Sequence, residues 1–96
     1  MSLKIFASQL KEDNWDRYFK YSQKLLSMLS DDTKNILDDV NIPHDIKVVV
    51  IGRVHNYAKE WLFSSLPILN NYRPIDLLDT EEGTKAVKEV LLRMPE

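Results

Sequence analysis

The sequence predicts an all-α fold, a compact bundle of about five helices. Apolar residues recur at spacings of three and four along most of the chain, which is the period of an amphipathic helix. Only two glycines and four prolines interrupt this pattern, and the prolines stand where helices could start or stop. At 96 residues the chain is long enough for one hydrophobic core and too short for two, so residues 1–96 are expected to form one domain.

The N-terminal part, residues 1–42, is predicted to be a helical hairpin. Its first helix has Asn14 available as N-cap and shows one mainly apolar face. That face comprises Trp15, Tyr18, Phe19, Ser22, Leu25, Leu26 and Leu29. Ser30 and Asp31 offer a cap for a second, shorter helix, which ends before Pro43. The second helix carries Ile36, Leu37 and Val40.

The segment 46–63 admits two interpretations. The density of β-branched residues over 46–51, followed by Gly52, is typical of a buried strand and would make the fold α/β with a short strand at 46–51. A lone central strand would lack pairing partners, and the whole segment also shows a continuous helical stripe, so one long helix is favoured. The stripe comprises Ile46, Val49, Val50, Val54, Tyr57, Ala58, Trp61 and Leu62.

A turn and a short helix are predicted next. Asn70 and Asn71 follow Pro67 and indicate a polar turn. Pro74 suits the first turn of a helix because it has no N–H to leave unpaired there. We expect this helix to end near Leu78.

The last helix has clear start and stop signals. Asp79 or Thr80 can cap it, and Glu82 could complete a capping box with Asp79. Its end is marked by Pro95. The buried stripe comprises Val87, Val90, Leu91 and Met94.

Composition and charge exclude several classes of function. The chain has no cysteine, which removes disulfides, thiolate nucleophiles and cysteine-ligated metal sites. His44 and His55 fall in no metal-binding pattern. The pairs of consecutive acidic residues along the chain are typical of helix caps and solvated helix faces. No apolar stretch approaches the roughly 20 residues of a membrane span, and no signal peptide opens the chain. We expect a cytoplasmic protein that is not an enzyme, binds no metal or cofactor and contacts no membrane.

An ordered set of residues stands out between Trp61 and Gly83. It comprises Trp61, the loop leucine Leu69, the step Arg73-Pro74, the pair Leu77-Leu78 and Gly83, followed by a helix with Val87 and Val90. In this combination the segment resembles the toxin-binding domain of the Xre/MbcA/ParS-type antitoxins, in particular the MbcA-like branch. The toxin-binding-domain-like region is accordingly placed at 43–96.

The resemblance implies an all-helical antitoxin that binds and neutralises a cognate toxin. The toxin would be of the RES type, an NAD-consuming or ADP-ribosylating enzyme whose active site becomes blocked. The candidate partner-binding residues are Trp61, Phe63, Arg73, Pro74, Asp76, Leu77 and Gly83.

Several of these residues also have a structural interpretation. Trp61 lies on an apolar stripe, so core packing competes with a role as an exposed anchor. A glycine inside a helix costs up to about 1 kcal/mol relative to alanine, so Gly83 needs a structural reason. That reason could be the close approach of two helices. Arg73 is the best exposed candidate, although pairing with Asp76 or Asp79 within the fold is equally compatible with the sequence.

Two other functions remain open. A DNA-binding regulator of its own operon would use Lys20, Lys24, Lys34 and Lys47, but these lysines are interleaved with acids and the net charge is -2. Residues 1–40 also show no convincing helix-turn-helix, so DNA binding is uncertain. A helical dimerisation module, forming a homo-oligomer, would need a large shared apolar face.

Overall fold

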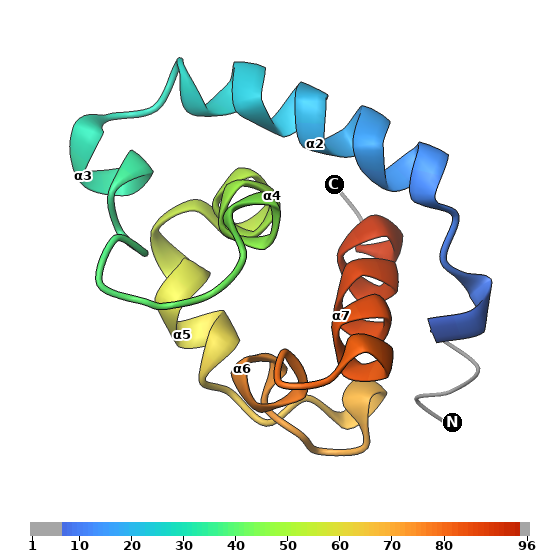
Figure 1. The fold of residues 1–96 in the computed structure, drawn as a ribbon. Coiled ribbons are helices and arrows are strands. Elements are labelled where there is room, and N and C mark those ends of the chain that lie inside the picture. The colour runs from blue at the N-terminus through green and yellow to red at the C-terminus, as the bar shows by residue number, and fades with distance from the viewer. Residues whose placement is uncertain (1–6, 95–96) are drawn as a thin grey trace.

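The structure, a computed structural model, describes residues 7–94. Within that range the chain forms α-helices and two short 3-10 turns, joined by loops (Figure 1). The helices are α2 (Glu12–Leu26), α3 (Asp31–Lys34), α4 (His44–Val54), α5 (Ala58–Leu62), α6 (Pro74–Leu77) and α7 (Glu81–Arg93). The 3-10 turns are η1 (His55–Tyr57) and η2 (Pro67–Leu69). The predicted all-α fold is confirmed.

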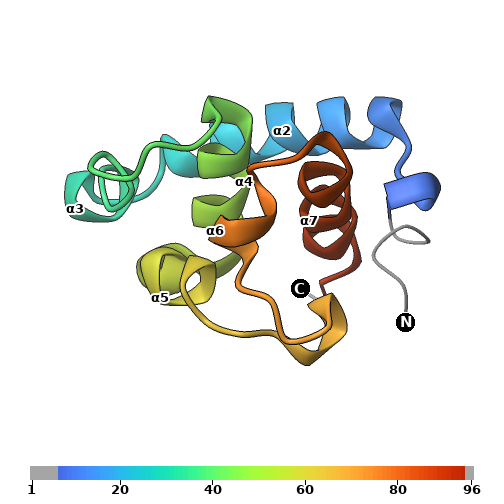
Figure 2. The same ribbon diagram turned by 60° about the horizontal axis from the view of Figure 1, so that its bottom comes forward.

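Helix α4 is the central element of the bundle. It packs beneath α2, with α7 alongside and α5 following it in the chain (Figures 1 and 2). Its residues Ile46 and 48–52 are all buried. A helix that is apolar all round belongs in the middle of a core, which explains why this segment also looks like a buried strand. The strand alternative for residues 46–51 is therefore wrong.

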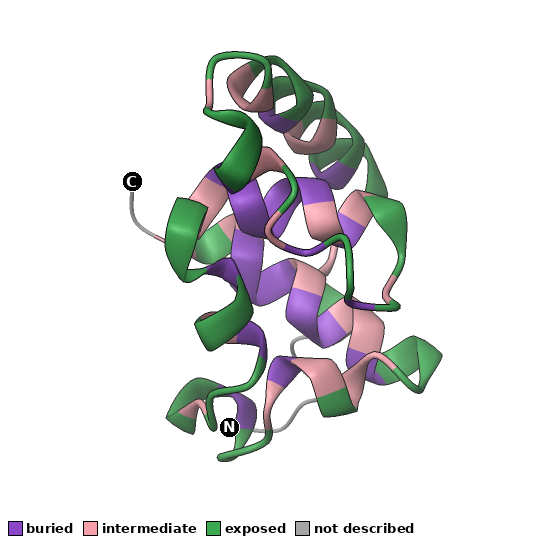
Figure 3. Ribbon diagram, turned by 90° about the vertical axis from the view of Figure 1, so that its left-hand side faces the viewer, coloured by how far each residue is buried: buried purple, intermediate pink, exposed green. Residues whose placement is uncertain are grey.

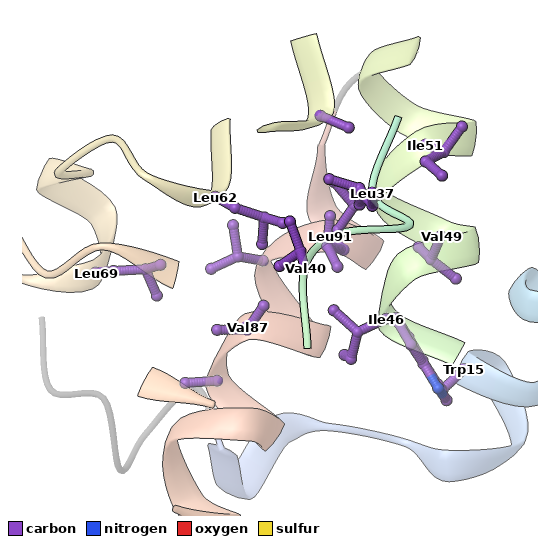
Figure 4. Close-up of a cluster of buried hydrophobic side chains, with 14 residues drawn as sticks. Trp15, Leu37, Val40, Ile46, Val49, Ile51, Leu62, Leu69, Val87 and Leu91 are labelled. Atoms are coloured by element: carbon purple, nitrogen blue, oxygen red, sulfur yellow. The ribbon is translucent and has the colours of Figure 1, made fainter. Parts of the chain in front are cut away.

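One hydrophobic core joins all parts of the described chain (Figures 3 and 4). Figure 4 shows side chains from α2, α4, α5, η2, α7 and the loop after α3 converging on the same volume. The core residues labelled there are Trp15, Leu37, Val40, Ile46, Val49, Ile51, Leu62, Leu69, Val87 and Leu91. Each is no more than 7% exposed, so residues before and after position 43 share this core.

Trp15 links three helices. Its indole N–H donates a hydrogen bond to Asp45 Oδ2 on α4 at 2.9 Å. Lys88 of α7 lies 3.6 Å from the same carboxylate oxygen and 5.3 Å from the centre of the Trp15 ring. The buried indole therefore has its one donor satisfied, at the point where α2, α4 and α7 meet.

Two details of the described chain before residue 43 differ from the sequence prediction. Helix α2 begins at Glu12, and Lys11 occupies the N-cap position. This cap lies three residues before the predicted cap at Asn14. Glu12 and Asp13 favour this start because they place negative charge at the positive end of the helix. Ser30 does cap α3, accepting the Thr33 N–H, but the helix ends at Lys34 and the residues that follow form turns.

The single long helix predicted over 46–63 is wrong. The chain leaves α4 at His55, which has φ 52° and ψ −120°, and passes through η1 before α5 begins. A backbone in this region cannot continue a right-handed helix.

Thr80 caps α7 as predicted by accepting the Gly83 N–H at 2.9 Å, whereas a capping box between Asp79 and Glu82 does not form.

Pro74 stands at the start of α6, as the sequence predicts. Pro95, the predicted end of the last helix, lies outside the described residues. Among the helices of residues 7–94, none has the length and apolar character needed to cross a membrane.

Candidate functional site

The loop that joins α5 to α6 has a defined conformation. Leu66 and Tyr72 face each other across an antiparallel bridge, in which the Leu66 N–H donates to the Tyr72 carbonyl at 3.2 Å. Asn70 and Asn71 have φ of 55° and 67°, so the predicted polar turn is confirmed. Leu69 is fully buried and fixes the loop to the core. The loop is therefore held at both its base and its tip.

This loop presents apolar side chains at the surface. Phe63 is 44% exposed, Ile68 47% and Tyr72 53%, and we call these three residues together with Arg73 the loop surface. Figure 2 shows the segment at the lower edge of the molecule, away from α2 at the upper edge. Isolated exposed apolar residues are common, but several on one short loop are typical of a binding surface.

Arg73 is oriented by two partners at this surface. Its Nε and Nη2 each donate to a different oxygen of Asp76 at 2.8 Å, forming a two-bond pair. Its guanidinium carbon lies 5.6 Å from the centre of the Phe63 ring. The hydrogen bonds raise the pKa of Arg73 and lower the pKa of Asp76 from their ordinary values. Both groups stay ionised, and the planar guanidinium is pre-oriented for a partner.

The other candidate residues from the sequence support the fold around this surface. Trp61 and Leu77 are partly buried and pack against the core, and Pro74 is buried. Gly83 is also buried, and a Cβ there would stand 2.1 Å from the Leu77 carbonyl oxygen. Phe63, Arg73 and Asp76 are thus the candidates that the structure brings together at the surface.

Ile68 and Tyr72 were missed by sequence reasoning. Both are large apolar residues inside a loop bounded by Pro67 and Pro74, where polar residues are the rule. Apolar side chains in a loop that cannot bury them are the signal that could have found them. Tyr57, 67% exposed in η1, is a further exposed aromatic residue in the C-terminal half.

The chemistry of the described residues points to binding. Over residues 7–94, no three His, Cys, Asp or Glu side chains gather in a way that could hold a metal ion. What the loop surface offers is aromatic and aliphatic area beside one oriented guanidinium, a combination enriched at protein interfaces.

Comparison with known proteins gives one match to a protein family. Residues 49–95 match the family described as antitoxin Xre/MbcA/ParS C-terminal toxin-binding domain. No curated protein and no solved structure matches the chain. The match begins inside α4, runs through the loop surface and takes in α7. The C-terminal part of this chain therefore belongs to the antitoxin Xre/MbcA/ParS C-terminal toxin-binding domain family.

Proposed function

We propose that this protein is an antitoxin that binds a cognate toxin of the RES or ADP-ribosyltransferase-like type and neutralises it by protein–protein contact, without catalysis of its own. The observation that carries the proposal is the family match over residues 49–95. The class of toxin rests on the resemblance of the segment from Trp61 to Gly83 to the MbcA-like branch.

We further propose that the loop surface contacts the toxin. Six large hydrophobic side chains are exposed in the described chain, and four of them lie within the matched residues. They are Tyr57, Phe63, Ile68 and Tyr72. Because a toxin-binding domain must expose its contact residues, this concentration favours the loop and η1 over the buried residues of the same segment.

Arg73 suits the role of a polar anchor at this surface. Its Nε and Nη2 are engaged by Asp76, which leaves donors of the guanidinium outside those two hydrogen bonds. A carboxylate on the toxin could accept from these donors while Phe63 packs against an apolar neighbour. Asp76 holds the guanidinium in place before binding, so less side-chain freedom is lost in the complex.

Co-expression with the product of the adjacent gene tests the proposal. The toxin alone should arrest growth, and this protein should restore it. Phe63→Ala with Arg73→Ala should abolish the rescue, because the substitutions remove the aromatic and cationic anchors without touching the core. Tyr21→Ala, which removes a similarly exposed aromatic residue from α2, should leave the rescue intact. A gene product that is harmless alone, or lethal despite this protein, would contradict the proposal.

A further inference from the structure

A second surface lies on α2 and is not explained by toxin binding. A groove of about 910 Å³ runs between the N-terminal half of α2 and the C-terminal turns of α7. Residues 8–11 also line it, and α2 contributes Arg17, Tyr18 and Tyr21. Figures 1 and 2 place α2 at the opposite edge of the molecule from the loop surface.

The side chains that α2 contributes to this groove are followed along the chain by further apolar residues, which together form an apolar row. Tyr18, Tyr21 and Leu25 of α2 follow one another at spacings of three and four, the pattern with which one helix packs along another. Met28 extends the row from the turn that follows α2. Tyr21 and Met28 are 47% and 81% exposed, and Leu25 is partly exposed. Within the described residues Tyr21, Leu25 and Met28 take no part in the core cluster, whereas Trp15 and Ser22 of the same helix are buried. Helix α2 therefore has two apolar faces, and the core uses one.

The charges around the groove are mainly basic. Its lining holds Lys11, Arg17 and Arg93 against one acid, Glu89, and that acid is 2.7 Å from Arg93 Nε. Lys24 stands seven residues after Arg17 on the same side of α2, so both cations flank the apolar row. Asp16 precedes Tyr18 by two residues, so its side chain points about 160° away from that of Tyr18 around the helix. Asp13, one turn before Arg17, is an acid on the same side as the two cations.

We infer that this groove, together with the apolar row that continues from it, docks an acidic amphipathic helix from a partner protein. The partner's apolar stripe packs on Tyr21, Leu25 and Met28, and its carboxylates face Arg17 and Lys24. A second copy of this chain fits less well, because its α2 would bring the same basic flank against this one. Nucleic acid would match the cations but would leave the leucine and methionine without apolar contacts.

Selection from a library of helical peptides tests the inference. The peptides have the length of α2, 15 residues, with leucine fixed at the heptad contact positions and Glu, Lys, Gln or Ala at the flanking ones. The bait is the full chain. Enriched peptides should carry Glu beside the leucine stripe, and their affinity should fall with rising salt because exposed charges are screened.

Variants then locate the bound peptide. Arg17→Glu and Met28→Lys should each weaken binding about tenfold, since one reverses a flanking charge and the other removes an exposed apolar contact. Both positions are exposed, so circular dichroism should show an unchanged helix content. Phe63→Ala should leave peptide binding unchanged, and Arg17→Glu should leave toxin binding unchanged, which separates this inference from the proposed function.

Four outcomes would overturn the inference. They are an absence of enriched peptides, enrichment of basic or charge-indifferent peptides, affinity that ignores both variants, and a single-stranded oligonucleotide that binds more tightly with the same dependence on Arg17.

Discussion

Gly52 of α4 lies directly against Ser22 of α2. A Cβ on Gly52 would stand 3.1 Å from both the Cβ and the Oγ of Ser22. Ser22 is fully buried, and its hydroxyl has no hydrogen-bond partner among the described residues. Two small residues thus allow α2 to approach the central helix closely, and this contact brings Trp15 of α2 within reach of Asp45 of α4.

Gly52→Ala should destabilise the protein by about 1 kcal/mol. The added methyl group meets a tight contact that costs about 1–3 kcal/mol, partly offset by the gain of about 1 kcal/mol in helix propensity. Urea denaturation followed by circular dichroism measures the free energy of unfolding. In the background of Ser22→Gly, which removes both contacting atoms, the same substitution should be neutral or stabilising. Equal effects in the two backgrounds would show that the contact does not set the helix separation.

Gly83→Ala should be more damaging than Gly52→Ala. Its Cβ would stand 2.1 Å from the Leu77 carbonyl oxygen and 2.8 Å from Thr80 Oγ1, and the first of these is a backbone atom that cannot rotate away. We expect a loss of more than about 2 kcal/mol in the free energy of unfolding, despite the better helix propensity of alanine. Glu82→Ala, at an exposed neighbouring position, is the control and should change stability little. A stable Gly83→Ala variant would mean that α6 and α7 can separate freely.

His55→Gly should stabilise the protein by about 1 kcal/mol. The backbone of His55 has φ 52° and ψ −120°, a conformation that glycine adopts without the strain a Cβ causes. His55→Ala keeps the Cβ and should give no such gain, so the difference between the two variants in thermal unfolding isolates the backbone effect. Equal melting temperatures would contradict the explanation for the break between α4 and η1.

The pair formed by Arg73 and Asp76 should be visible in a pH titration. The hydrogen bonds from Arg73 lower the pKa of Asp76 from its ordinary value of 3.8. The stabilisation from this carboxylate is therefore present above that value and is lost as the pH falls through the lower folded-state pKa. Arg73→Gln should raise the Asp76 pKa in a carbon-detected NMR titration. Asp39, whose pKa is lowered by Lys59, should not respond.

The sequence predicts the helices that have local signals. Thr80 and Ser30 cap α7 and α3 because a side-chain oxygen that accepts a backbone N–H is a property of a few neighbouring residues. Pro74 marks the start of α6 for the same local reason. The break at His55 has no such signal, since nothing in its neighbours requires a positive φ. After the break, α5 places Ala58 and Leu62 in the core, a tertiary contact that no local pattern reports.

The candidate site is only partly predictable. The sequence pattern from Trp61 to Gly83 identifies the family segment, and the pairing of Arg73 with Asp76 is one of the two pairings it allows. The sequence pattern does not separate residues that contact a partner from residues that support the fold, because the same leucines and prolines fit both roles. The buried Leu69 forces Ile68 and Tyr72 outward, and that consequence of the loop conformation requires the structure.

Size-exclusion chromatography of this protein mixed with the product of the adjacent gene is the sharpest test of toxin binding. We expect a stable stoichiometric complex that forms with the unmodified chain and with Tyr21→Ala but is lost with Phe63→Ala combined with Arg73→Ala. Two separate peaks for the unmodified chain would contradict the claim that it binds and neutralises a toxin. A complex that survives the double substitution would contradict the assignment of the loop surface.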